Sequence, residues 1–227
     1  MMSMTVLSMS GTTFVQLLDL AVGLVLVTSF AALWLRRLAT VIRVLAVQGL
    51  ALAAVAAVIG LYEGEAELVA VAIMVAVLRV VVMPGLIMRA VRAGDEHREV
   101  ESLINVPASL LAASGLTLLA YATMGDVVAL SASPQVRAIP IGVAVTLIGM
   151  LLIISRRKAV LQIMGVLMID NGIALVMFLG TSGVPLVVEL GIACDVLLAM
   201  FILQVLTNRI RNKFGATDLD QLQELRD

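Results

Sequence analysis

Three carboxylates interrupt two long apolar runs toward the end of the chain. Asp170 lies in the run over 158–180, and Glu189 and Asp195 lie in the run over 184–206. A charged side chain at the centre of a bilayer costs about 2.5–3.5 kcal/mol on insertion scales, and such residues commonly serve ion or proton pathways. The residue types and their spacing therefore predict ion or proton transfer by these acids.

Arg79 is a cation in the middle of an earlier apolar run, over 66–91. Pro84 follows it and cannot donate the backbone hydrogen bond that the carbonyl of Val80 would accept, which predicts a kink beside the arginine. From a depth of about 15 Å the side chain cannot reach the membrane surface. We interpret Arg79 as a charge on an ion path; the alternative is an arginine paired with a neighbouring carboxylate for packing alone.

The rise of a helix, about 1.5 Å per residue, converts sequence position into membrane depth. On this measure Asp170, Asp195 and Arg79 lie about 15–21 Å from the basic flanks of their runs, whereas Glu189 lies nearer the opposite face. A neighbouring arginine favours the ionised carboxylate and burial opposes it, so an acid at this depth can load and release a proton. The sequence predicts a relay near the membrane midplane.

Two further polar residues lie in the same run as Asp170. Asn171 is adjacent to it, and Gln162 falls near the same side of a helix, so both are candidate supporting groups. A static network of Asp170, Asn171 and Arg79 that only orders the helices is the alternative.

The composition is that of a membrane protein. Of the 227 residues, 62% are hydrophobic and 14% are charged, and the mean hydropathy is +1.12. Apolar runs of about 20 residues, the length of a transmembrane helix, recur along the chain. We expect an all-α polytopic membrane protein with about seven transmembrane helices, over 14–35, 41–62, 66–91, 106–125, 138–155, 158–180 and 184–206.

The basic residues are distributed unevenly over the connections between these runs. Most of the 15 lysines and arginines flank the first, third and fifth connections or follow the last run, whereas the second connection is acidic. By the positive-inside rule we expect the amino terminus outside and the carboxyl terminus in the cytoplasm. The expected location is the inner (plasma) membrane, with multiple passes.

The longest charged connection suggests a division of the chain. We expect a three-helix membrane part over 1–92, a cytoplasmic connection over 93–105, a four-helix part over 106–206 and a cytoplasmic tail over 207–227. Leucines recur in the tail at a spacing of three, which indicates a short amphipathic helix.

Cysteine and histidine are nearly absent, with one of each, Cys194 and His97. A four-cysteine iron–sulfur site, a structural zinc site and a disulfide framework are therefore excluded within this chain. We expect no cofactor, no metal and no catalytic residue in this chain, and no nucleic-acid partner.

The carboxyl-terminal runs carry motifs that resemble a known family. The last three spans, within 138–206, look like the NuoK-type subunit of respiratory complex I and its MrpC relatives, and the whole chain resembles the HyfE family, membrane component E of hydrogenase-4 complexes. The residues that carry the resemblance are Arg156-Arg157, Gly165, Asp170-Asn171-Gly172, Glu189-Leu190-Gly191, Asp195 and the ending from Asp218 to Arg226. Arg79 takes the place of the family's mid-span lysine, and because an arginine stays protonated in proteins it can act there only as a fixed charge.

The resemblance implies a membrane-arm subunit of a complex-I-like group 4 NiFe-hydrogenase or formate hydrogenlyase-type complex. Such a chain would be a non-catalytic subunit of an oxidoreductase, contributing proton or cation translocation and coupling through its intramembrane acids. The implied partners are antiporter-like and anchor membrane subunits, and peripheral subunits that hold the NiFe and iron–sulfur centres.

Two alternatives to this function stay open. One is a structural membrane scaffold in which Asp170, Asp195 and Arg79 only hold helices together. The other is a subunit of an Mrp-type cation/proton antiporter, which the MrpC-like part allows.

Overall fold

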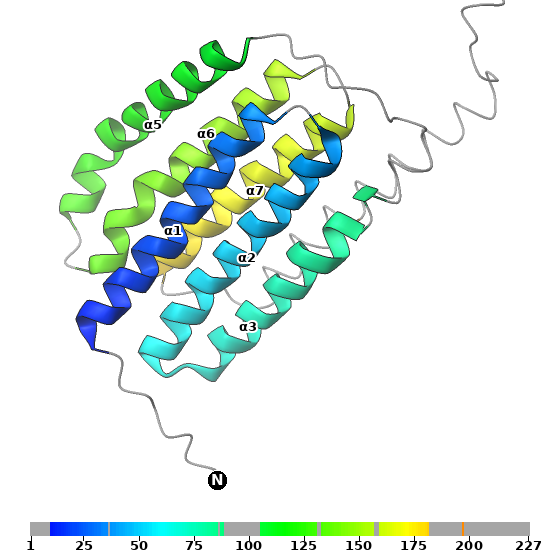
Figure 1. Ribbon diagram of the computed structural model, residues 1–227. Coiled ribbons are helices and arrows are strands. Elements are labelled where there is room, and N and C mark those ends of the chain that lie inside the picture. Colours follow the sequence, from blue (N-terminus) through cyan, green and yellow to red (C-terminus); the bar gives the residue numbers. More distant parts are fainter. Residues whose placement is uncertain are drawn as a thin grey trace, which may run out of the picture. The chain divides into compact units, whose positions relative to one another are not determined.

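The computed structural model describes residues 10–35, 37–85, 87–88, 105–130, 133–156, 159–181 and the single residue 197 (Figure 1). Contacts divide the chain into two units, Met1–Leu190 and Gly191–Asp227. All the helices and contacts described below belong to the first unit.

The described residues are almost entirely helical. The elements in chain order are α1 (Gly11–Trp34), α2 (Leu38–Glu63), α3 (Ala66–Ala76), the π-helix η1 (Val77–Val82), α5 (Val106–Ala129), the 3₁₀-helix η2 (Pro134–Ala138), α6 (Ile139–Ser155) and α7 (Ala159–Thr181). Within the described residues, six helical segments are long and apolar enough to cross a membrane: Gly11–Trp34, Leu38–Glu63, Ala66–Gly85, Val106–Ala129, Pro134–Ser155 and Leu161–Gly180. These segments correspond to six of the seven expected spans in length and composition, and the seventh, over 184–206, lies outside the described residues apart from Leu197.

Local sequence explains where several helices begin and end. The Ser10 side chain caps α1 by accepting the backbone N–H of Thr13 at 3.3 Å, as serine does at helix starts. Gly64 ends α2 with a left-handed φ of 74°, which glycine adopts without steric cost. Because only Gly64 and Glu65 separate α2 from α3, these helices run antiparallel side by side (Figure 1).

Glycines bring α6 and α7 into close contact. Gly142 and Gly149 on α6 face Gly172 and Gly165 on α7: a Cβ placed on Gly172 would lie 2.6 Å from the backbone nitrogen of Thr146 and 2.8 Å from the carbonyl oxygen of Gly142. Backbone atoms cannot move aside as a flexible side chain can. Small residues therefore let these antiparallel helices approach as transmembrane helices often do, and this contact supports the segment that carries Asp170.

Helices α1 and α2 pack together and each contacts the α6 and α7 pair. At one end the rings of Phe14 and Tyr62 stack with their centroids 4.1 Å apart. At the other end the buried Arg156 donates from Nη2 to the carbonyl of Leu33 at 2.8 Å, a contact that suits the negative end of a helix dipole. The basic first and fifth connections therefore begin at the same end of the helices.

Candidate functional site

Arg79 and Asp170 form an ion pair between η1 and α7. Nη2 of Arg79 lies 2.6 Å from Oδ2 of Asp170, and the two side chains are 10% and 15% exposed. Both lie inside apolar spans, where breaking a buried pair leaves an uncompensated charge. The two residues that the depth argument placed at one level are thus direct partners.

The arginine projects from a π-helix, the six-residue η1. Its wide turn is visible in the hydrogen bond from the N–H of Met83 to the carbonyl of Leu78, five residues earlier. Pro84 follows directly, lacks an N–H, and disfavours a regular α-helical turn before it. The sequence predicted a kink here; the structure has a π-helical turn, a feature frequent at functional sites.

Helix α2 contacts η1 directly beside the arginine. A Cβ placed on Gly49 would lie 2.5 Å from the Cβ of Arg79 and 3.4 Å from its carbonyl carbon and oxygen. Glycine at residue 49 therefore permits a close approach that would be obstructed by any side chain.

Asn171 links the ion pair to the interior of the protein. Its Oδ1 accepts a hydrogen bond from Nη1 of Arg79, and its Nδ2 donates to Oε1 of Gln48 at 2.8 Å. Nε2 of Gln48 then donates to Oγ of Ser29 at 2.7 Å and to the carbonyl of Val25 at 3.2 Å. We call this set the polar chain; its side chains are Asp170, Arg79, Asn171, Gln48 and Ser29, from α7, η1, α2 and α1.

The charge of Arg79 determines the direction of every bond in the polar chain. A guanidinium only donates, so the amide of Asn171 must turn its oxygen toward Arg79 and its NH₂ toward Gln48. Gln48 must then accept from Asn171 and donate toward Ser29. The side chains of Asn171, Gln48 and Ser29 are buried, at 3% exposure or less. A change at the ion pair would therefore alter a series of oriented hydrogen bonds that extends to α1.

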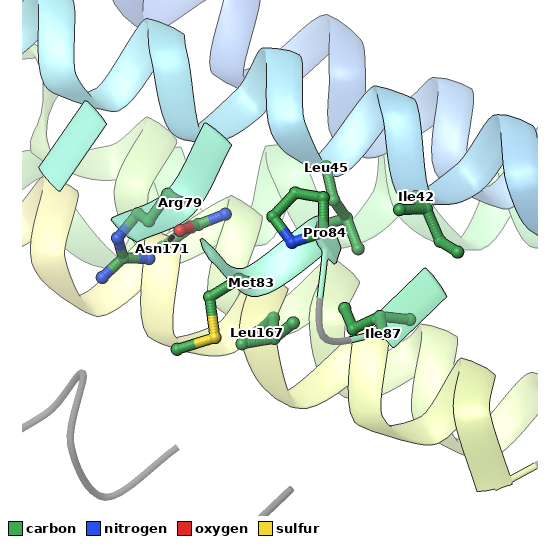
Figure 2. A pocket seen from close by; sticks show the side chains of 8 residues that line it. All are labelled: Ile42, Leu45, Arg79, Met83, Pro84, Ile87, Leu167 and Asn171. Atoms are coloured by element: carbon green, nitrogen blue, oxygen red, sulfur yellow. Dashed lines mark hydrogen bonds between the residues drawn. The ribbon is translucent and has the colours of Figure 1, made fainter. Parts of the chain in front are cut away.

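A small cavity lies beside Arg79 and Asn171 (Figure 2). Its volume is about 20 Å³, enough for about one water molecule where polar partners are present. The lining residues are Arg79 and Asn171, which are polar, and Ile42, Leu45, Met83, Pro84, Ile87 and Leu167, which are apolar. The site thus combines a carboxylate, a fixed cation, an oriented amide and space for a solvent molecule.

The other candidate residues lie elsewhere. Gln162 is exposed and donates from Nε2 to the carbonyl of Arg156 at 3.2 Å. Glu189 and Asp195 lie outside the described residues. Within the described part of the chain, no group of three or more His, Cys, Asp or Glu side chains could hold a metal.

Sequence reasoning missed Gln48, Ser29 and Gly49. Gln48 was detectable as the sole amide within the apolar α2 run, but a single amide does not reveal its partner. The sequence does not distinguish Gly49 from the other glycines, because its role depends on which helix packs against it.

Comparisons with known proteins place the chain in a family. No family model matches it and no solved structure matches it. Hydrogenase-4 component E of Escherichia coli (strain K12) and its namesake from Shigella flexneri are each 35% identical over 80 residues, which cover 35% of this chain and 37% of theirs. "Uncharacterized protein Rv0085" of Mycobacterium tuberculosis is 45% identical over 220 residues, which cover 96% of this chain and all of that protein. The chain therefore belongs to the same family of multi-pass membrane proteins as the mycobacterial protein Rv0085.

Proposed function

We propose that this protein is a membrane-arm subunit of a complex-I-like, hydrogenase-type assembly and that it transfers protons, or another cation, through Asp170. Support comes from the partial likeness to hydrogenase-4 component E and from the site itself. The ion pair of Arg79 and Asp170 inside apolar helices is the observation that carries the proposal, because charges buried at this depth commonly serve ion pathways.

In this mechanism Asp170 is the group that gains and loses the proton. Arg79 remains a cation throughout, since a guanidinium does not deprotonate in proteins. When Asp170 is ionised, the pair is neutral. When Asp170 takes up a proton, Arg79 keeps the hydrogen bond to Oδ1 of Asn171, so the cation still has an acceptor.

The small cavity beside Arg79 and Asn171 supplies a place for the water that such a transfer needs. Its apolar lining residues Met83, Ile87 and Leu167 would limit hydration to that point. The π-helix is the natural moving element, because its i+5 bonds differ from regular α-helical bonds and the two arrangements would orient Arg79 differently.

The remaining features of the proposal follow from the sequence. Glu189 and Asp195 continue the pathway, the amino terminus lies outside and the carboxyl terminus in the cytoplasm of a bacterial-type inner membrane. The partners are antiporter-like and anchor membrane subunits and peripheral redox subunits, and 207–227 docks on the cytoplasmic side.

The test is to purify the native complex from cells that carry Asp170→Asn, and to measure both co-purifying subunits and redox-driven proton movement in vesicles. We expect the complexes that assemble to move fewer protons per electron. Asp126→Asn is the matched control: Asp126 is exposed on α5 and its neutralisation should leave both readouts unchanged. Wild-type proton movement by the assembled Asp170→Asn complex would refute the transfer role.

A scaffold role is the second candidate, and the polar chain favours it. Its hydrogen bonds join α1, α2, η1 and α7, which is what a purely structural network would do. Under this reading Asp170→Asn lowers the yield of assembled complex, while the complexes that do assemble move protons at the wild-type ratio.

A further inference from the structure

A second cavity lies at the end of the helices where the basic first connection begins. It is a cleft of about 650 Å³ between the α1–α2 turn and the start of α5. The ends of α1 and α6 and the starts of α2 and α5 all lie at this end (Figure 1). The lining residues are Trp34, Leu35, Arg37, Thr40, Val106, Pro107 and Leu110.

Three features make this cleft electropositive. Arg37 is exposed and lines it. Arg156, buried behind the wall, donates from Nη2 to the carbonyl of the lining residue Leu35 at 3.4 Å. The 24-residue helix α5 begins at the cleft, with no side-chain cap from Asn105, so its positive dipole end and its first N–H groups add to the potential. Among the residues that the structure describes, no acidic side chain lines the cleft.

The remaining walls are apolar. Trp34 is 64% exposed, and Leu35 and Leu110 complete the apolar lining together with Val106 and Pro107. Tryptophan is enriched at membrane interfaces, where its ring lies among lipid headgroups. A free phosphate ion would neutralise the cations but leave the apolar walls exposed to water. A phospholipid would suit both, because its phosphate can pair with the cations while its acyl chains cover the apolar walls.

We propose that this cleft is a binding site for an anionic phospholipid, with the phosphate beside Arg37 and the acyl chains against Trp34 and Leu110. Thr40 lies in the lining as a hydroxyl donor to the headgroup. This site is separate from the ion pair of Arg79 and Asp170, and it holds whether or not the chain transfers protons.

The test uses the full-length protein in nanodiscs of phosphatidylcholine, titrated with phosphatidylglycerol and read by native mass spectrometry of lipid that stays bound. Arg37→Gln removes the cation in the cleft. Arg43→Gln is the matched control, because Arg43 is also exposed near the start of α2 but does not line the cleft. Trp34→Ala tests the apolar wall, and inorganic phosphate is added as a competitor.

Wild-type protein should retain phosphatidylglycerol in preference to phosphatidylcholine. Arg37→Gln should weaken that retention about fivefold, as expected for one cation at an anionic surface, with Arg43→Gln unchanged. Trp34→Ala should weaken retention of both lipids. The proposal is overturned if wild type shows no preference, if the two arginine variants behave alike, or if inorganic phosphate displaces the lipid completely. Equal thermal unfolding temperatures in phosphatidylcholine show that the variants are folded.

Discussion

Gly49 and Arg79 approach so closely that residue 49 has no room for a side chain. A Cβ on Gly49 would lie 2.5 Å from the Cβ of Arg79, closer than real Cβ atoms come. This contact brings α2 against η1, and it places the neighbouring Gln48 where Asn171 can reach both Gln48 and Arg79. The helix contact and the polar chain therefore depend on each other.

Gly49→Ala should destabilise the protein by about 1–3 kcal/mol, the usual cost of adding atoms to a packed interior. The added methyl meets the Cβ and backbone of Arg79, so relief requires η1 to move away from α2. The measurement is the free energy of unfolding in mixed detergent micelles titrated with SDS.

The control for this substitution is Gly23→Ala on α1, where a Cβ would meet nothing within 4 Å. Alanine is the better helix former by about 1 kcal/mol, so this variant should be as stable as wild type or more so. Equal stability of the two alanine variants would contradict the close contact of α2 and η1.

Gln48→Leu should cost about 1–3 kcal/mol, because it leaves Nδ2 of Asn171 buried without its acceptor. Gln16→Leu is the matched control, since Gln16 is exposed on α1, and its stability should equal wild type. The same SDS titration measures both. If Gln48→Leu unfolds at the wild-type SDS concentration, the polar chain contributes nothing to stability.

The pairing of Arg79 with Asp170 could be anticipated from the sequence. Because the rise of a helix is constant, the distance of each residue from its basic flank predicts its depth in the membrane, and the two depths are similar. Depth alone does not predict which helices are neighbours, and that is why Gln48 and Ser29 were missed. Their roles depend on α1 and α2 packing against α7, which a single sequence does not specify. The bounds of five spans were predicted to within four residues, because apolar runs of membrane length leave little choice. The third span, expected over 66–91, is described over Ala66–Gly85.

The π-helix could not be derived from Pro84 alone. A proline removes one backbone donor, and the chain can respond with a kink or with a wider turn. Here the contact of Arg79 with Gly49 and the ion pair with Asp170 are both made from the wider turn. Tertiary partners therefore select between two responses that the sequence permits equally.

The orientation of the chain in the membrane can be tested with single cysteines in a Cys194→Ser background. Glu65→Cys lies in the acidic α2–α3 turn and Arg37→Cys in the basic α1–α2 turn, and both positions are exposed. By the positive-inside rule, an impermeant maleimide should label Glu65→Cys in intact cells and Arg37→Cys only after permeabilisation. The reverse pattern would place the amino terminus in the cytoplasm.

A double-mutant cycle on Arg79 and Asp170 separates the two functional readings. Arg79→Gln and Asp170→Asn each remove one charge of the buried ion pair, whereas the double variant removes both. We expect each single variant to be destabilised and the double variant to be more stable than their sum predicts, by about 1–3 kcal/mol. Additive losses in the SDS titration would mean that the pair contributes no coupling.

The same double variant decides what the pair is for. If Arg79 and Asp170 only hold helices together, neutralising both restores assembly and proton movement, because the remaining amides can still bond to each other and to Asn171. If Asp170 carries the proton, the double variant assembles but moves fewer protons per electron, because an asparagine cannot be protonated and deprotonated at this depth. Subunit content and redox-driven proton movement in the same vesicles distinguish these outcomes.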